Sequence, residues 1–298
     1  MDRVGTNRVT QGALVAASMA SLQRRMDGLA NVQEQLSTGK VLNRPSDSPT
    51  DTTAAMRLRS TLAAQHQYLR NAQDGLSWTG LIDQTLGSVT DQVRRARELA
   101  LQGATGSMSS AARTALAAEV RQIREGLLDQ ANADYLGRPV FGGTTAGREA
   151  YDATGTYVGV AEPVLRATAD GVRVRVDVAG PDVFGDGATS VFAELEALAV
   201  ALEAGDEVAI RGSIDILRTR LDTVDAARAG VGATTNRLER TVQQNHDTTI
   251  DLTSDLSDVE DIDLAKVLMD LQVQEVAYQA ALAGTARVLQ PSLVDFLR

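Results

Sequence analysis

Residues 12–36 read GALVAASMASLQRRMDGLANVQEQL, and their apolar side chains recur at alternating intervals of four and three residues. These intervals place the apolar side chains on one stripe of an α-helix and leave the opposite face polar. Residues 258–290 read DVEDIDLAKVLMDLQVQEVAYQAALAGTARVLQ, and they repeat this pattern near the other end of the chain. A lone helix cannot bury such a stripe. We therefore predict that the two terminal helices pair with each other, with copies of the same chain, or with both.

The two stripes define a candidate assembly interface. Gln33 is the polar exception in the first stripe, and Glu275 interrupts the second. A chain with an apolar seam near each end has the layout of an assembly subunit. The predicted interface residues are Val15, Met19, Leu22, Met26, Leu29, Leu36, Leu264, Leu268, Leu271, Tyr278, Leu282 and Leu289.

The composition favours long packed helices over a ligand-binding core. Hydrophobic residues make up 43% of the 298 residues, which is enough for a folded core, but aromatic residues make up only 3%. Enclosed ligand pockets usually depend on aromatic side chains. The abundance of Ala, Leu, Val, Arg, Asp, Gln and Thr is instead typical of helical bundles.

Charge and cysteine content exclude several classes of function. The net charge of −10 argues against nucleic-acid binding, because phosphates require clustered Lys and Arg. The chain has no cysteine, so disulfides and thiolate chemistry are excluded. No stretch approaches the roughly 20 apolar residues that span a bilayer, so we expect no membrane segment. Residues 1–12 are polar, and we expect no cleaved secretory signal.

Local signals predict the order of the elements. The first helix should end near Gly39, a suitable residue for the position after a helix. The second should begin at Pro49 with Ser48 as its N-cap and continue to about Ala100. The third should open at Ser109 or Ser110 and end near Asn132.

The remainder of the chain predicts a β excursion followed by more helix. Residues 172–178 alternate strictly between valine and charged residues, as a half-buried strand does. A short helix should follow from Val191, and a long periodic segment from about residue 207 to Leu252. The segment Ser257–Glu260 resembles a capping box, which predicts the start of the final helix.

We therefore predict a mainly α fold: an elongated antiparallel helical bundle or coiled coil of paired N- and C-terminal helices, with a small β-rich insertion domain. The expected domains are a terminal assembly domain (1–45 with 258–298), a helical rod (46–140 with 189–257) and the insertion (141–188).

No residue pattern predicts catalysis, a cofactor or a metal site. His66 and His246 are far apart in sequence and lack ligands at helical spacing. The acidic residues between Asp251 and Asp263 lack the glycine and terminal glutamate of a calcium loop. There is no nucleophile elbow and no phosphate-binding loop. Trp78 is interpreted as a packing anchor between helices, with an intersubunit contact as the alternative.

Several strings are similar to those of the flagellin family. Leu36–Lys40 with Asn43–Pro49 resembles the end of that family's first helix, in the form found in its hook–filament junction members. Arg97–Gln102 is similar to a run that occurs widely in the family, and Tyr135–Gly143 resembles the entrance to the β insertion of the junction members. The closest resemblance is the tail, Met269–Arg298.

The resemblance implies a secreted, extracellular structural protein of the bacterial flagellum, located at the hook–filament junction. It implies export as an unfolded chain through the flagellar type III apparatus. The implied partners are copies of the chain in a ring or helical tier, a neighbouring hook-associated protein, flagellin, and an export chaperone on the C-terminal helix. Nucleic acid and membrane are not expected partners.

Three alternatives remain at the level of sequence. The first is a filament flagellin, although Arg44–Pro49 and the C-terminal ending depart from the flagellin pattern. The second is a secreted enzyme with its site in residues 141–188, a region without histidine. The third is an extracellular coiled-coil adhesin, for which sustained heptads without paired ends would be expected.

Overall fold

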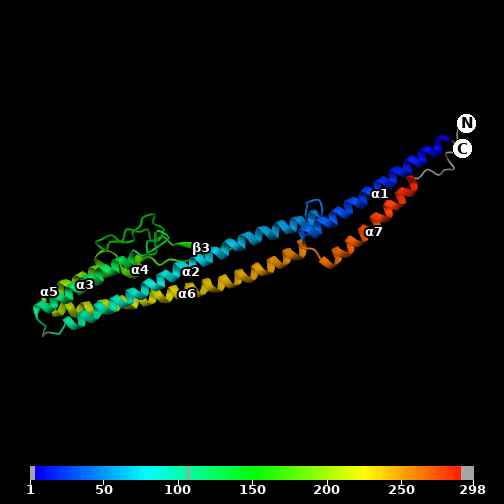
Figure 1. Ribbon diagram of the computed structural model, residues 1–298. Helices are drawn as coiled ribbons and strands as arrows, with labels where there is room; N and C mark the ends of the chain where they lie inside the picture. The colour runs from blue at the N-terminus through cyan, green and yellow to red at the C-terminus, as the bar shows by residue number, and fades with distance from the viewer. Residues whose placement is uncertain (1–3, 106–107, 290–298) are drawn as a thin grey trace. The chain divides into compact units, whose positions relative to one another are not determined.

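The chain is mainly helical. The computed structural model describes residues 4–105 and 108–289 (Figure 1). The described residues form seven α-helices, one short 3-10 turn and two small antiparallel sheets, which confirms the predicted fold class. Two compact units divide the chain: the first contains the residues up to Ala63 and those from Ile250, and the second contains Ala64–Thr249. The β-rich insertion lies in the second unit.

The helices are long at both ends of the chain and short in its middle. Each sheet is a two-stranded hairpin, β1 with β2 and β3 with β4. The helices are α1 Val4–Thr38, α2 Pro49–Gly103, α3 Ser110–Ala131, α4 Gly180–Phe184, α5 Val191–Ala204, α6 Glu207–Glu260 and α7 Leu264–Leu289. The strands are β1 Asp134–Tyr135, β2 Arg138–Pro139, β3 Leu165–Ala169 and β4 Val172–Arg175.

Most of the predicted helix ends are confirmed. Gly39 follows α1 with a φ of +71°, the left-handed conformation that favours glycine. Ser48 precedes Pro49, and its hydroxyl accepts the amide of Asp51 at 3.4 Å. Ser109 caps α3 by accepting the amide of Ala112 at 3.2 Å. Short polar side chains at these positions satisfy backbone amides that the helix leaves unpaired.

The predicted start of the final helix is wrong. α6 continues through Ser257 and ends at Glu260, and α7 begins only at Leu264. Asp263 is the cap, since its carboxylate accepts the amides of Ala265 at 3.0 Å and Lys266 at 3.2 Å. The glutamate of the apparent capping box binds two cations instead, as described below. The Ser-x-x-Glu spacing also occurs in the interior of helices, so it does not distinguish the start of a helix from its interior.

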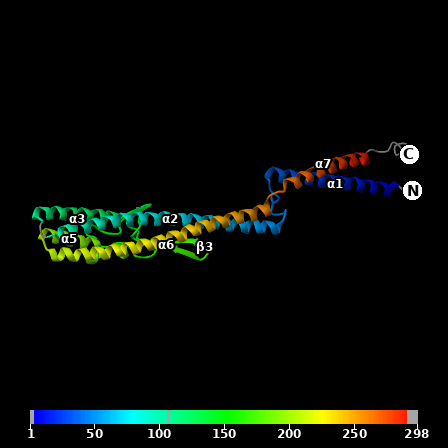
Figure 2. The same cartoon turned by 90° about the horizontal axis from the view of Figure 1, so that it is seen from below.

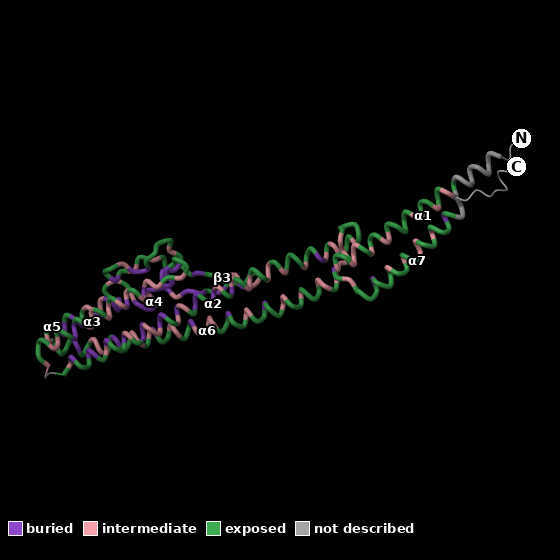
Figure 3. Tube along the Cα trace, viewed as in Figure 1, coloured by how far each residue is buried: buried purple, intermediate pink, exposed green. Residues whose placement is uncertain are grey.

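The core of the second unit lies between α2, α3, α5 and α6. Figure 3 shows the buried residues gathered around α3, α5 and the insertion. Trp78 is among the largest fully buried side chains and packs edge-on against Tyr135, with ring centroids 5.5 Å apart. Trp78 is therefore a buried packing anchor, as interpreted, but the aromatic ring that it meets belongs to β1 and not to another helix.

Aromatic residues are few, but the insertion concentrates them. Phe141, Tyr151, Phe184 and Phe192 are fully buried there and contact one another, mostly edge to face. Aromatic pairs of this kind contribute about 0.5–1.5 kcal/mol beyond the area that they bury. This cluster gives a segment with little regular secondary structure a core of its own.

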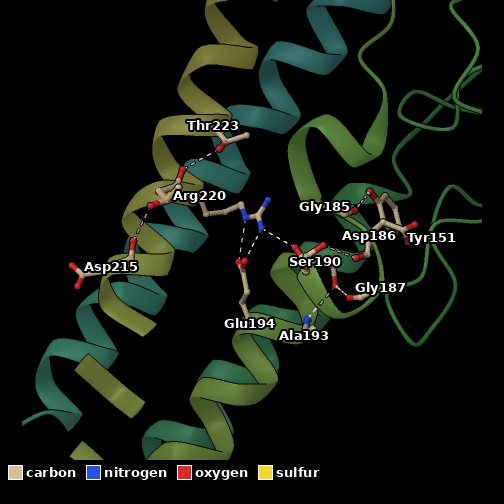
Figure 4. A network of polar contacts seen from close by, with 12 residues as sticks. Tyr151, Gly185, Asp186, Gly187, Ser190, Ala193, Glu194, Asp215, Arg220 and Thr223 are labelled. Carbon is tan, nitrogen blue, oxygen red and sulfur yellow. Dashed lines mark hydrogen bonds and ion pairs between the residues drawn. The ribbon is translucent and has the colours of Figure 1, made fainter. Parts of the chain in front are cut away.

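Polar contacts attach the insertion and α5 to the long helices. Arg220 of α6 donates to the carboxylate of Glu194 at 2.6 Å and to the carbonyl of Thr189 at 2.9 Å (Figure 4). Asn71 of α2 and Asn245 of α6 donate to backbone carbonyls of the β3–β4 hairpin at 2.8 and 3.1 Å. These amides satisfy carbonyl groups that a two-stranded sheet leaves unpaired.

The alternating segment 172–178 is only partly a strand. β4 ends at Arg175, although the amide of Val176 still donates to Val164 at 3.0 Å. Val174 and Val176 are buried as the alternation predicts. Asp177 is also buried, because it accepts the Val164 amide at 2.7 Å and pairs with Arg175 at 3.1 Å.

We expect Gly143→Ala to destabilise the second unit by about 2–4 kcal/mol. Gly143 has a φ of +61°, and a Cβ there would overlap the carbonyl oxygen of Val160. Gly212→Ala is the control, because Gly212 lies in α6 with open space around it, and it should stabilise by about 0.5–1 kcal/mol. Urea unfolding followed by the fluorescence of Trp78 measures both. Equal effects of the two substitutions would show that the close approach at Gly143 imposes no steric constraint.

Candidate assembly interface and its junction

The two terminal helices lie side by side in the first unit. α1 and α7 pack together along their lengths and run antiparallel (Figures 1 and 2). A Cβ added at Gly28 of α1 would lie 3.2 Å from the side-chain oxygen of Gln274 of α7, so the side chain of Gln274 lies directly against α1 there. The predicted intramolecular pairing of the two ends is therefore present.

The seam of α7 has a regular spacing. Its inward positions recur at alternating intervals of four and three residues, as in a coiled coil. Val267 and Thr285 are buried, and the four positions between them are partly buried. These inward residues are Val267, Leu271, Gln274, Tyr278, Ala281 and Thr285. On α1 the partly buried positions at matching spacing are Val15, Ser18, Leu22, Leu29, Val32 and Leu36.

Half of the predicted interface residues lie in this seam. The partly buried ones are Val15, Leu22, Leu29, Leu36, Leu271 and Tyr278, whereas the exposed ones are Met19, Met26, Leu264, Leu268 and Leu282. The side chain of Leu289 lies outside the described residues. The predicted stripes therefore contained residues from two faces of each helix. Every seventh residue of a stripe belongs to the inward face, and the residues between them lie on an adjacent face that points outward. Contact of these residues with neighbouring subunits stays a prediction.

Sequence reasoning missed part of the seam for a physical reason. On each helix, two different sets of positions satisfy alternating intervals of three and four residues. Val267 and Val32 belong to the set that the prediction did not choose. Ser18 and Ala281 are small, so they do not register as apolar positions. Small side chains allow helices to approach closely, so small residues can occupy seam positions that a search for apolar residues overlooks.

α7 carries apolar side chains outside the seam as well. Met269, Val273 and Val276 are 61–66% exposed. Val273 and Val276 line a shallow groove with Ala277 and Ala280. A helix with apolar residues on several faces is typical of a helix that is buried on all sides. α7 therefore exposes apolar surface that its pairing with α1 does not cover.

A buried carboxylate fixes the end of α6 to the loop after α1. Glu260 is 1% exposed, and its carboxylate lies 2.5 Å from the Lys40 ammonium and 2.8 Å from the Arg59 guanidinium. The amide of Val41 donates to the carbonyl of Glu260 at 2.7 Å, and the amide of Ile262 donates to Gly39 at 3.1 Å. We call these contacts the Glu260 clamp.

The two cations determine the ionisation of Glu260. Burial alone would raise its pKa, but the hydrogen bonds and charges of Lys40 and Arg59 outweigh burial and lower the pKa below its usual value. Because the folded chain holds the carboxylate in its charged form, the clamp contributes its full stability above the pKa of the unfolded chain. This contribution is lost as the pH falls through the lowered pKa.

Other candidate sites do not form. His66 and His246 are both exposed. Across residues 4–105 and 108–289, no three side chains of metal-ligating type gather into a group. No helix in the described part of the chain is sufficiently long and apolar to span a membrane.

Comparison with protein families gives a match near each end of the chain. The model of the bacterial flagellin N-terminal helical region matches residues 10–146, and that of the C-terminal helical region matches residues 214–297. The chain belongs to the flagellin family. The matched segments contain most of α1, all of α7 and the residues of the Glu260 clamp. The unmatched residues 147–213 contain most of the insertion and α5.

Individual proteins also align with the chain over most of their own length. Flagellar hook-associated protein 3 of Escherichia coli is 27% identical and covers 87% of this chain and 92% of its own length. The flagellar filament 31.3 kDa core protein of Treponema maltophilum is 28% identical, with coverages of 92% and 94%. A putative flagellar hook-associated protein from Vibrio parahaemolyticus shares the fold with a TM-score of 0.66 at 21% identity, covering 72% of this chain and all of that one.

We expect Glu260→Gln to loosen the first unit by roughly 1–3 kcal/mol, because it leaves Lys40 and Arg59 beside a neutral group. Hydrogen exchange at the amides of Val41 and Ile262 measures the change. The protection factor, which compares the exchange rate with the intrinsic rate at the same pH, should fall on acidification in the wild type as the carboxylate protonates, and the variant should lack that fall.

Glu34→Gln is the matched control for this variant. Glu34 pairs with Arg44 at 2.8 Å, but the pair is solvent-exposed, so the loss should stay below about 1 kcal/mol. Wild-type protection factors at Val41 and Ile262 that are equal at neutral and acid pH would show that the clamp has no role in stability.

Proposed function

We propose that this chain is a structural subunit of the bacterial flagellum that links the hook to the filament. The observation that carries the proposal is the alignment of nearly the whole chain with hook-associated protein 3, together with flagellin-type helices at both ends. Filament proteins of the family also align over most of the chain. The departures from the flagellin pattern at Arg44–Pro49 and at the C-terminal ending favour the junction over the filament.

The exposed faces of the terminal helices supply the driving force for assembly. The seam joins α1 to α7 within one chain, and the outward apolar residues remain available to neighbours. Each square ångström of apolar surface that a neighbour covers contributes about 25 cal/mol, less the cost of ordering. Head-to-tail contacts between identical subunits generate a ring or a helical tier.

The same faces account for the proposed partners. The tier would lie between a neighbouring hook-associated protein and the first flagellin subunits, outside the cell. Export through the flagellar type III apparatus would require the chain to travel unfolded, and a chaperone on the apolar C-terminal helix would protect it before export. The chain has no cysteine that could cross-link it on the way. We propose no catalytic activity and no cofactor.

Seam and outer-face substitutions should block assembly in different ways. Leu271→Asp or Leu22→Asp places a charge in the seam, so α1 and α7 should separate while Trp78 in the second unit stays buried. Val276→Asp lies on the exposed face, so the pairing of α1 with α7 should persist while assembly fails. Hydrogen exchange reports the pairing, and electron microscopy of cells that carry each variant reports the filaments.

The control for these variants is Leu22→Met, a swap that conserves volume and should assemble normally. Full-length filaments on cells that carry only Leu271→Asp would show that the seam is not needed.

The position of the protein on isolated flagella separates the junction from the filament. Gold-labelled antibody should bind at one spot just beyond the hook, and the purified protein should not form long filaments alone. Labelling along the filament, or self-polymerisation into filaments, would favour the flagellin alternative.

A further inference from the structure

The turn between β1 and β2 presents a strained apolar residue to solvent. Leu136 has a φ of +53°, and no other non-glycine residue of the described chain has a positive φ. Gly137 follows with a φ of +79°. Two successive residues of this kind form the tight hairpin turn in which Asn-Gly is favoured. The leucine is therefore in an unfavourable backbone conformation, and its side chain is 83% exposed.

Contacts with α2 hold the strands of this turn in position. The hydroxyl of Tyr135 donates to Asp74 at 3.3 Å, and its ring packs against Trp78. Pro139, on the other strand, is buried. A side chain that is fixed in position before contact loses little conformational entropy when it binds. The strained backbone on a fixed support makes Leu136 a candidate contact residue.

A groove on another part of the same unit suits such a side chain. It has a volume of about 700 Å³ and lies between α6 and the segment around Val176. Ala226, Gly230 and Val231 form part of its lining, and a Cβ added at Gly230 would meet no atom within 4 Å. The groove therefore contains apolar lining residues and is open above Gly230.

The lining charges of the groove are negative overall. Arg175 and Asp177 pair with each other at 3.1 Å. Asp182 and Asp222 also line the groove, are exposed, and form no ion pair within the described residues. The groove therefore favours a partner that brings an apolar side chain together with a positive charge.

We propose that Leu136 of one copy enters this groove on the neighbouring copy. Arg138 lies two residues away, and its guanidinium is 5.9 Å from the ring centre of Trp78 without pairing to a carboxylate in the described part of the chain. It supplies the positive charge that Asp182 and Asp222 attract. Asp134, the acidic residue of the turn, already accepts the amide of Gly137 at 3.0 Å.

The partner is a second copy because each chain carries both halves of the contact. The turn and the groove are different surfaces, so the contact can be made head-to-tail and continue from copy to copy, as a ring or helical tier requires. The inference rests on the proposed assembly at the junction and names one of its contacts. Leu136 would be an anchor within a larger interface, where a few buried side chains dominate the binding.

Cross-linking tests the contact directly, since the natural chain has no cysteine. Cells would produce two single-cysteine variants together, Leu136→Cys and Ala226→Cys, and their isolated flagella would be oxidised. A disulfide-linked dimer should form only when both variants are present. Gly212→Cys, on the same helix outside the groove, replaces Ala226→Cys as the control and should yield no dimer.

Two substitutions should stabilise the free chain and yet weaken the assembly. Leu136→Asn relieves the strain of the turn, and Gly230→Leu fills the groove on a helix that tolerates leucine better than glycine. Both should raise the melting temperature by a few degrees and lower the number of filaments retained under shear several-fold. Gly212→Leu should raise the melting temperature without loss of filaments.

The outcomes separate this inference from the proposed function. Absence of the mixed dimer, with normal filament retention in Leu136→Asn and Gly230→Leu, would overturn the contact while antibody at the junction still supported the function. Absence of wild-type protein from the junction would overturn both.

Discussion

The first unit depends on the apolar seam between α1 and α7. Its side chains come from opposite ends of the sequence, so the seam forms only when the chain has returned along the antiparallel path set by α2 and α6. Thr285 and Gln274 lie in the seam beside leucine, tyrosine and alanine. A seam of mixed polarity holds the pair together and leaves larger apolar residues on the outer faces, which fits a subunit whose final stability comes from neighbours.

The second unit uses a different means of stabilisation. Its bundle and its aromatic cluster bury side chains completely. Asn71 and Asn245 fix the insertion to the long helices, and Arg220 fixes α5 to α6. The residues that family comparison does not match are thus attached through polar contacts to helices that it does match. An insertion held in this way can vary in sequence without altering the helices beneath it.

The sequence predicted the helices well because their signals are local and periodic. Gly39, Ser48 and Ser109 act through neighbours within four residues, so their caps were found. Glu260 was misassigned because its partners Lys40 and Arg59 are remote in sequence, and no periodic pattern records a contact of that kind. The prediction of the seam residues was half correct. Alternating intervals of three and four residues fit two sets of positions on each helix, and only the packing of α1 on α7 shows which set faces inward.

The Glu260 clamp also has a mechanical consequence. Tension applied to α1 reaches the two long helices by different routes. It enters α2 through the covalent loop, and it enters α6 through the hydrogen bonds of the Val41 and Ile262 amides with the ion pairs beside them. The loop alone therefore does not carry the load. Torque that enters through the terminal helix is spread over α2 and α6 where the Glu260 clamp joins them.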